Sequence, residues 1–348
     1  MQKRKILILG AAYGLLPAMR ILKTGHQVTV VCRPEEQTQF IERGATLIYR
    51  GTKDKEGLRL ESSAQLGIAP SGTLGVSGAD IDASGFDLVI LAMSEPYFGA
   101  PEIYALMQQI ADAKLPVLAI TNTPPPTFLD RLESVDTKNV KEAFLAWETW
   151  ALLDPKCVTA ASPDAQAVRK KPSCLNELTV MLGSDFKVAP FHHPAHQNLL
   201  LQLSDDLNRY RENGVPCRVQ IKAAPTLYAP LAKWPMLITG NCRCLKTDGS
   251  IIPICDAVHT DIEASESIYN WVSEIVRRMG ANATDLVPFR YYGKVSKRLK
   301  APSSYARSIA AKSLHVERID KLIQLTGKSF GMSLPELDQL VSHVDDFG

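Results

Sequence analysis

The sequence predicts the class α/β + all-α, with a parallel-sheet domain over residues 1–225 and a mainly helical domain over residues 226–348. In the first part, apolar runs of strand length alternate with helical patterns, which is typical of a parallel sheet. From Lys233 onward nearly every apolar pattern has helical spacing. The length of 348 residues is sufficient for two domains.

The first 33 residues predict a strand, a tight turn, a helix and a second strand. Apolar runs occupy residues 5–9 and 27–32, helical spacing covers residues 15–23, and a small-residue turn covers residues 10–14. This order opens a Rossmann-type βαβ unit, in which a pyrophosphate binds the N–H groups at the helix N-terminus. We therefore expect a dinucleotide to bind at Gly10, Ala11, Ala12 and Gly14.

The turn departs from the motif G-x-G-x-x-G. If Gly14 is counted as the third glycine, the first two places hold Leu9 and Ala11. If Gly10 is counted as the first, the other places hold Ala12 and Leu15. The alternative interpretation is an α/β domain that begins with a buried strand and an amphipathic helix and binds no nucleotide.

The residue that ends the second strand indicates which dinucleotide binds. Domains that prefer NAD have Asp or Glu there to bind the ribose 2′-hydroxyl, whereas this chain has Arg33. A guanidinium group forms charge-assisted hydrogen bonds with a phosphate. We therefore predict NADP(H) as the cofactor.

Further elements continue the alternation. The patterns predict helices at 35–43 and 101–113, strands at 46–49, 86–93 and 116–121, and short strands or loops over 51–84. Because ligands bind at the carboxyl ends of parallel strands, residues 10–14, 93–96 and 122–126 should converge on one crevice. Later strands are expected at 157–162, 178–182, 187–191 and 217–223, with a helix at 195–213. The second domain should have helices at 235–244, 250–279 (broken near Asp256), 303–311, 316–330 and 335–344.

Composition excludes several classes of protein. Hydrophobic residues make up 45% and charged residues 22%, and no apolar run is long enough to span a membrane. The N-terminus runs directly into a strand, so we expect no signal peptide. A net charge of +2 gives no reason to expect nucleic acid, and the basic run 294–300 is expected to be solvated. Seven cysteines without a disulfide framework fit a reducing cytoplasm.

Two groups of residues resemble metal ligands. Cys242 and Cys244 form a C-x-C pair without a second pair at zinc-site spacing, so we interpret them as small buried thiols. His192, His193 and His196 are interrupted by Pro194, and we expect them to introduce a helix. No metal is predicted.

Lys233 is a candidate general acid. Reduction of a carbonyl group needs an acid for the developing alkoxide and donors for the other substrate oxygens. Lys233 begins the helical domain among Leu231, Trp234 and Met236, and apolar surroundings lower the pKa of an amine. Asn241 follows two helical turns later. The alternative is a surface lysine at the start of a helix.

Five segments, taken in order, resemble the ketopantoate reductase (2-dehydropantoate 2-reductase) family. They are 25–33 (GHQVTVVCR), 117–122 (VLAITN), Lys233 with Asn241, 301–304 (APSS), and 317–320 (ERID) followed by 330–332 and Pro335. The resemblance implies that Arg33 binds the 2′-phosphate of NADPH and that Asn122 contacts cofactor and substrate. It also implies that Lys233 is the catalytic acid, that Ser303 or Ser304 binds substrate, and that Glu317 assists.

The chain departs from the family pattern at several places. Leu237 replaces an orienting Asn. Ser94 replaces a Lys near the cofactor phosphate, and we expect Ser94 to contact the cofactor. Asn122 is followed by Thr-Pro-Pro-Pro instead of Gly-Leu-Gly, which stiffens the loop. The family Glu corresponds either to Glu317 or to the position of Arg318. The chain between Asn122 and Lys233 is also longer than the resemblance leads us to expect.

Three functions remain open. The first is an NADPH-dependent reductase of a 2-oxo acid or related carbonyl, with a small-molecule oxo-acid as partner. The second is an opine-type dehydrogenase that reduces an imine, for which His259 and Asp261 are a candidate pair. The third is a scaffold that binds NADP(H) without turnover. A homodimer is expected through the apolar faces of helix 316–330 and the long helix of the second domain.

Overall fold

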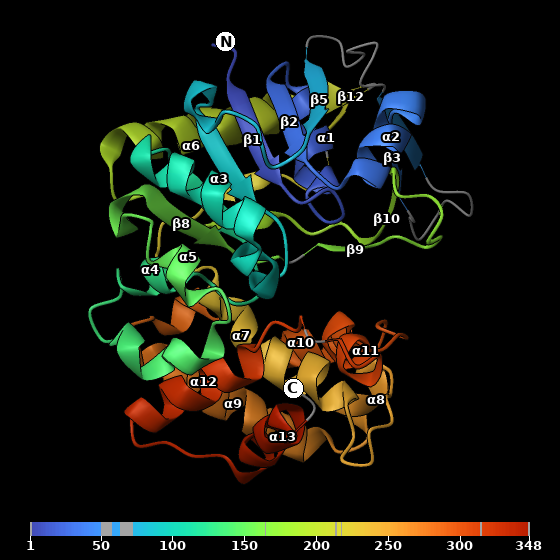
Figure 1. Cartoon of the computed structure of the whole chain (residues 1–348). Coiled ribbons are helices and arrows are strands. Elements are labelled where there is room, and N and C mark those ends of the chain that lie inside the picture. Colours follow the sequence, from blue (N-terminus) through green and yellow to red (C-terminus); the bar gives the residue numbers. More distant parts are fainter. Residues whose placement is uncertain are drawn as a thin grey trace. The chain divides into compact units, whose positions relative to one another are not determined.

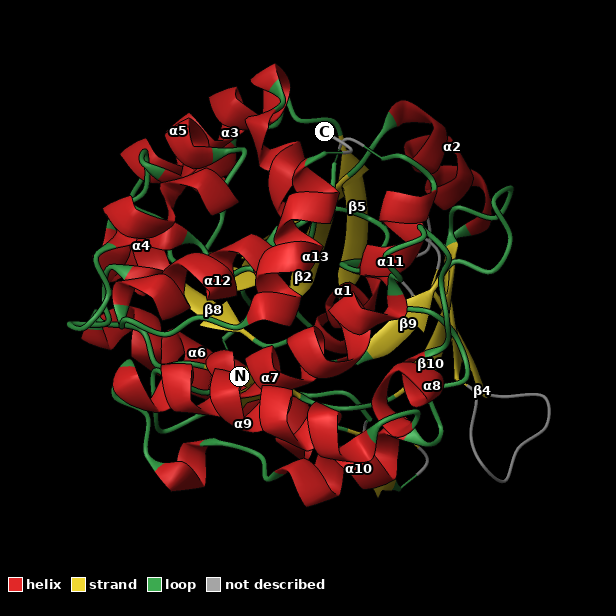
Figure 2. Ribbon diagram, turned by 90° about the horizontal axis from the view of Figure 1, so that it is seen from below, coloured by secondary structure: helices red, strands yellow, loops and turns green. Residues whose placement is uncertain are grey.

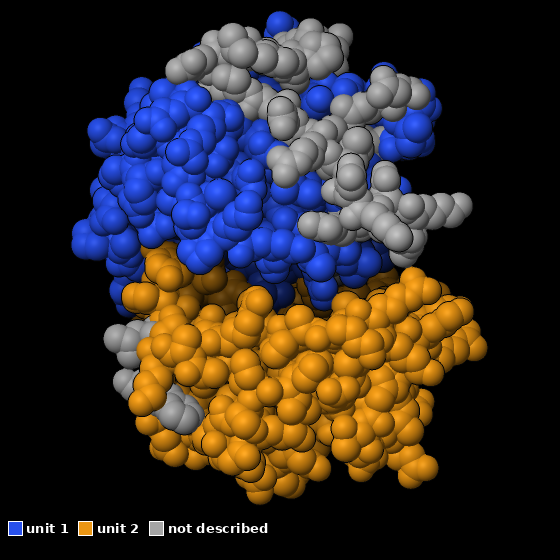
Figure 3. Space-filling view, turned by 90° about the vertical axis from the view of Figure 1, so that its right-hand side faces the viewer, with its two compact units in different colours: residues 1–93, 98–128, 148–225 blue, residues 94–97, 129–147, 226–348 orange. Residues whose placement is uncertain are grey.

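The computed structural model describes residues 2–49, 58–62, 72–163, 165–212, 214–216, 218–313 and 315–346. The chain divides into two compact units, which Figure 3 shows in different colours. Unit 1 comprises Met1–Met93, Phe98–Phe128 and Glu148–Pro225, and unit 2 comprises Ser94–Tyr97, Leu129–Trp147 and Thr226–Gly348. The division into domains at residue 226 stays a prediction.

Unit 1 is built on an eight-stranded sheet (Figure 1) with the order β14-β11-β8-β7-β6-β1-β2-β5. The strands are β1 (Lys5–Leu9), β2 (Gln27–Val31), β5 (Thr73–Ser77), β6 (Leu88–Leu91), β7 (Val117–Ile120), β8 (Val158–Ala161), β11 (Phe186–Val188) and β14 (Ile221–Ala223). All neighbours from β5 to β8 are parallel, and β11 pairs antiparallel with β8. Numbered along the chain, these six parallel strands have the order 3-2-1-4-5-6 of a Rossmann sheet.

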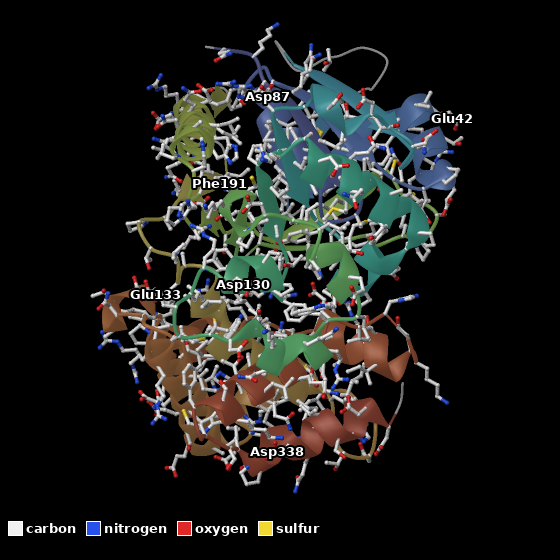
Figure 4. All side chains as sticks on the ribbon, turned by 60° about the vertical axis from the view of Figure 1, so that its left-hand side comes forward. Glu42, Asp87, Asp130, Glu133, Phe191 and Asp338 are labelled. Carbon is white, nitrogen blue, oxygen red and sulfur yellow. The ribbon has the colours of Figure 1, made fainter. Side chains whose placement is uncertain are left out.

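Helices cover this sheet and bury its strands. Four of them are α1 (Leu15–Lys23), α2 (Pro34–Arg43), α3 (Pro101–Asp112) and α6 (Pro194–Arg209). Side chains of α1 and α6 join Ile6 and Ile8 in one apolar core. At the start of β6, the carboxylate of Asp87 (labelled in Figure 4) accepts a hydrogen bond from the Lys5 amide at 2.7 Å and ties β6 to β1.

A second sheet of unit 1 combines segments that are distant in the sequence. It has the order β4-β3-β10-β9, formed by Leu58–Ser62, Ala45–Tyr49, Glu177–Leu182 and Gln166–Val168. The pairing of β3 with β10 is parallel, and Asn176 Nδ2 donates to the Gly44 carbonyl oxygen at 3.0 Å beside it. Strand 46–49 was predicted, but its partners were not. A small hairpin, β12 (Arg211–Glu212) with β13 (Val215–Pro216), follows α6.

Unit 2 consists of helices and loops; Figure 2 draws the helices of the whole chain in red. Its helices are α7 (Trp234–Met236), α8 (Ile254–His259), α9 (Ile262–Arg278), α10 (Phe289–Ser296), α11 (Ser304–Ala310), α12 (Ile319–Ser329) and α13 (Pro335–Asp345). The short helices α4 (Pro126–Leu129) and α5 (Trp147–Trp150) lie at the unit boundaries. Every named strand of the described chain lies in unit 1, so the predicted fold class is confirmed.

The predicted elements differ from the structure in several places, and two differences concern helices. The break expected near Asp256 is present but lies at Thr260 and Asp261: α8 continues to His259, and Asp261 Oδ1 then caps α9 by accepting from the Ala264 amide at 2.9 Å. Helix 195–213 ends at Arg209, because Tyr210 is extended (ψ 133°) and leads into the hairpin strand β12. Within the predicted segment 51–84, residues 51–57 and 63–71 lie outside the described residues.

Candidate functional site: a dinucleotide half and a lysine-bearing helix

The turn after β1 keeps two glycine functions in a shortened loop. Gly10 has φ +105°, and a Cβ there would lie 2.5 Å from Met93 Cγ. A Cβ on Gly14 would lie 2.1 Å from the Gly10 carbonyl oxygen and 2.8 Å from Ile8 Cγ2. Gly10 therefore makes the tight turn and Gly14 permits close contact between helix and strand, which are the functions of the first and third motif glycines. Neither predicted count of the motif is right, because this loop is one residue shorter.

The residues between these glycines leave the N-terminus of α1 accessible to an anion. Ala11 is buried and Ala12 is exposed. Tyr13 turns aside, since its hydroxyl donates to the Ala165 carbonyl oxygen at 2.6 Å. The first turn of α1 contains no acidic residue that would neutralise the positive end of the helix dipole. The turn therefore fits a pyrophosphate.

Within unit 1, the strands that precede the three predicted segments end at one edge of the sheet, and the crevice itself stays a prediction. Leu9 pairs with both Val31 and Leu91, and Leu91 pairs with Ala119. The strands thus end together, and the segments that follow them start at one edge. The Gly10 amide donates to the Val31 carbonyl oxygen at 3.0 Å, which closes the turn against β2.

Arg33 lies directly after β2 and N-caps α2. Its side chain is 65% exposed, and its guanidinium is 3.0 Å from a carboxylate oxygen of Glu35. The Arg33 Nε is 3.5 Å from Glu36 Oε2, and the Arg33 amide donates to the same oxygen at 3.0 Å. Arg33 is therefore held at the end of β2 with most of its side chain in solvent.

Glu36 joins Arg33 to a second arginine. Glu36 Oε1 accepts from Nη1 of Arg169 at 2.5 Å, and the Glu36 side chain is only 6% exposed. Burial alone would raise the pKa of Glu36, but the hydrogen bond from Arg169 and the bond from the Arg33 amide lower it. Burial and the charge of Glu36 raise the pKa of the neighbouring Cys32 to about 12, so this thiol stays protonated at neutral pH. Sequence reasoning missed Glu36 and Arg169.

Asn122 follows β7 in a tight loop. The Thr121 hydroxyl donates to the Thr123 carbonyl oxygen at 2.8 Å across it. Asn122 is half-buried, while Thr123 and the three prolines at 124–126 are buried. The three prolines that we expected to stiffen this loop are therefore also buried.

Ser94 lies in unit 2 with the rest of segment 94–97. Glu95 connects this segment to residues 129–147, because its buried carboxylate accepts from the amides of Leu145 and Ala146 at 3.1 and 2.9 Å. The prediction that Ser94 contacts the cofactor stays a prediction.

Lys233 and Asn241 share one continuous helical segment. Leu231–Lys233 is a 3₁₀ turn, α7 follows, and Leu237–Asn241 forms a π-turn. Both Lys233 and Asn241 are half-buried. In a regular α-helix, residues eight apart are about 80° out of line. A wider turn rotates less per residue, so the π-turn brings Asn241 nearer to the face of Lys233.

The π-turn has an identifiable cause. The Tyr292 hydroxyl of α10 donates to the Met236 carbonyl oxygen at 3.2 Å, which is the oxygen that Gly240 would bond in an α-helix. A Cβ on Gly240 would lie 1.9 Å from that hydroxyl. Gly240 thus makes room for Tyr292, and Tyr292 diverts the hydrogen-bond ladder. Leu237, at the position of the family's orienting Asn, is buried.

The two serines before α11 differ in environment. Ser303 is buried, and its hydroxyl donates to the Asn241 carbonyl oxygen at 2.6 Å and accepts from the Ala306 amide at 3.1 Å. Ser304 is exposed at the first position of the helix. The structure thus brings Ser303 to Asn241, while Ser304 is the serine whose side chain faces solvent.

Arg318 N-caps α12 in an ionic network. Its Nη2 is 2.9 Å from Asp320 Oδ2, and its Nη1 contacts Asp345. Burial alone would lower the pKa of Arg318, but the hydrogen bond and charge of Asp320 raise it. Glu317 beside it is half-buried. Because Arg318 is bound to these two carboxylates, Glu317 is the residue that we keep as the candidate for the glutamate of the family motif.

The remaining predicted residues have structural environments. His259 contacts the Ser296 hydroxyl at 3.1 Å, and Asp261 caps α9, so the structure gives each residue of the candidate opine pair its own partner. His193 caps α6 by accepting from the Ala195 amide at 3.2 Å, which confirms that these histidines introduce a helix. Cys242 and Cys244 are buried, as interpreted.

Three findings concern the described part of the chain only. No three His, Cys, Asp or Glu side chains there are grouped to hold a metal ion. No helix there has the length and apolar character needed to cross a membrane. The apolar faces of α9 and α12, which suggested a dimer, are buried in unit 2 itself.

The two units define a class of fold, a Rossmann-type α/β unit with a helical unit, and solved structures share it. No family model and no curated protein matches the sequence. A putative ketopantoate reductase from Ralstonia solanacearum has a TM-score of 0.68 at 16% identity, covering 99% of this chain and 98% of its own. A D-mandelate dehydrogenase in complex with NADH and anilino(oxo)acetate has 0.63 at 16%, covering 99% and 97%.

A dimeric ketopantoate reductase from Staphylococcus aureus has a TM-score of 0.62 at 12% identity, with coverage of 99% of this chain and 98% of its own. At such identities the likeness shows the fold alone. The chain has the fold of ketopantoate reductases, and the resemblance inferred from its motifs is confirmed at that level.

Proposed function

We propose that this protein is a divergent member of the ketopantoate reductase family and reduces the carbonyl group of a 2-oxo acid with NADPH. The observation that carries the proposal is the position of Arg33, at the end of β2 and beside the glycine turn of a Rossmann sheet. The matched folds of 2-oxo acid reductases support the substrate class.

The surroundings of Arg33 favour NADPH over NADH. An NAD site needs a carboxylate that is available to the ribose hydroxyls. Glu36 is buried, and both its oxygens already accept hydrogen bonds from Arg33 or Arg169. Glu35 is paired with the Arg33 guanidinium. A 2′-phosphate, in contrast, would meet an exposed guanidinium.

The chemistry assigns a function to residues of each unit. Gly10 and Gly14 admit the pyrophosphate, and bound NADPH supplies the hydride. Lys233 donates the proton from its ammonium group to the carbonyl oxygen and is left as a neutral amine. Asn122, Asn241 and Ser303 or Ser304 are assigned as donors that orient the substrate, and Glu317 is assigned as an acceptor that assists them. A homodimer also belongs to the proposal, and light scattering of the purified protein tests it.

The experiment begins with titrations of NADPH and NADH, followed by a panel of 2-oxo acids. We expect tighter binding of NADPH and turnover of at least one acid. Lys233→Met should lower kcat by roughly 10²–10⁴-fold, the usual contribution of general acid catalysis, and leave the NADPH dissociation constant unchanged. Lys246→Met, at an exposed lysine of the same unit, is the control. Full activity of the Lys233 variant, or no binding of NADPH, would refute the proposal.

A further inference from the structure

We infer that Arg169 is a second phosphate-binding residue and that, together with Arg33, it binds the 2′-phosphate of NADP(H). The inference rests on the proposed function, because it assigns a further residue to the same cofactor site. Its basis is the Arg169 guanidinium, in which Nη1 has a hydrogen-bond partner and two buried nitrogens have none among the described residues.

Arg169 reaches the end of β2 from a distant part of the sequence. It directly follows β9, the outer strand of the second sheet, and its side chain is 16% exposed. Its Nη1 binds Glu36 Oε1, while Glu36 Oε2 binds the amide and Nε of Arg33. The Glu36 carboxylate therefore holds two guanidinium groups at the end of β2, where the proposal places the ribose of the cofactor.

The other nitrogens of Arg169 indicate a missing acceptor. Nε and Nη2 are buried and have no hydrogen-bond partner within the part of the chain that the structure describes. Burying donors of a cation without acceptors is costly. An anion with several oxygens would satisfy both nitrogens, since Nε and one Nη form the fork that binds phosphate.

The local charges suit a dianion. Arg33 and Arg169 carry two positive charges, and Glu36 neutralises one of them. Glu35 pairs with Arg33 in solvent, where screening weakens its effect. Lys170 and Lys171 follow Arg169 and are exposed, so they add positive charge. A phosphate with a charge of about −1.5 to −2 at pH 7 is therefore attracted.

Two ligands that differ only in the 2′-phosphate test the inference directly. These are 2′,5′-ADP and AMP, titrated into the full-length protein. Arg169→Gln should weaken 2′,5′-ADP binding by roughly 10–100-fold, as expected for charge-assisted hydrogen bonds, and leave AMP binding unchanged. Lys187→Gln removes the same charge from an exposed lysine elsewhere in unit 1 and should change either affinity by less than about threefold.

A purely structural function of Arg169 would give a different result. If Arg169 only supports Glu36, Arg169→Gln should weaken both ligands equally or neither, which overturns the inference. Because loss of this ion pair can also unfold unit 1, Arg169→Lys is measured as well. It keeps a charge beside Glu36 but lacks the fork, so we expect weaker binding of 2′,5′-ADP alone. Unchanged binding of both ligands by Arg169→Lys also overturns the inference.

The outcomes separate this inference from the proposed function. If the wild type binds NADPH no better than NADH, the cofactor assignment itself fails. If the wild type prefers NADPH and Arg33→Gln removes the preference while Arg169→Gln does not, only the inference about Arg169 fails. Loss of the preference in both variants supports both.

Discussion

Replacing Gly14 by Ala should destabilise unit 1 by a predictable amount. The new Cβ would lie 2.1 Å from the Gly10 carbonyl oxygen, whereas ordinary contact begins at 3.4 Å, so backbone must move by about 1.3 Å. Overpacking costs typically 1–3 kcal/mol. Because the obstacle is backbone and not a flexible side chain, we expect about 3 kcal/mol. At roughly 2–4 °C per kcal/mol, Tm should fall by about 6–12 °C.

Gly85→Ala is the matched control in the same unit. A Cβ there meets no atom within 4 Å, and Gly85 does not have a positive φ. Such a substitution stabilises a protein by about 0.4–1 kcal/mol, because it restricts the unfolded chain. The two variants should therefore shift Tm in opposite directions. Thermal melts measure these shifts, and NADPH titration should show weaker binding for Gly14→Ala alone. Equal melting of Gly14→Ala and wild type would refute the steric argument.

Two further predictions concern a buried histidine and the π-turn. Burial lowers the pKa of His26 from 6.5, although Asp206 at 3.4 Å opposes the shift. As pH falls, the unfolded chain therefore binds a proton at this histidine before the folded chain does. The contribution of His26 to the free energy of unfolding is fully present above about pH 6.5 and is lost as pH falls below it. Melts from pH 7 to 5 should decline less steeply for His26→Gln, and parallel curves would contradict this. Tyr292→Phe removes the hydrogen bond to the Met236 carbonyl oxygen and should lower the free energy of unfolding by about 1 kcal/mol. It should also lower kcat without changing NADPH affinity, whereas Tyr291→Phe, at a residue 54% exposed, should change neither stability nor kcat. Equal kcat values for the two variants would contradict the idea that Tyr292 positions Asn241 through the π-turn.

The local elements were predictable because their signals are local. The predicted bounds of β1 and α1 agree with the structure, since apolar periodicity is strong there and glycines bound the turn between them. The pairing of β3 with β10 could not be predicted, because it joins segments that are far apart in the sequence. A single sequence shows that a segment suits a strand but not which strand is its partner.

The candidate site also combines residues that the sequence could predict with residues that it could not. Arg33 was predictable, because its place depends only on the strand before it. Arg169 was not, because β9 brings it to Glu36 through the second sheet. The π-turn beside Lys233 was also missed, since its cause is a hydroxyl from another helix, Tyr292. Arg169 lies outside every strand that the sequence predicted and directly follows β9, so the local pattern gave no signal for it.

The glycine turn shows how a Rossmann-type turn forms with a spacing that departs from the motif. A motif model requires glycines at fixed spacing, and here Gly10 and Gly14 are one residue too close together. The physical requirements are different: a residue that tolerates φ +105° after β1, and a residue without a side chain where α1 meets the Gly10 carbonyl oxygen. Both requirements are met in the shorter loop. The spacing of the two glycines therefore differs from the motif, while the steric conditions for a tight turn and for close contact between helix and strand are both met.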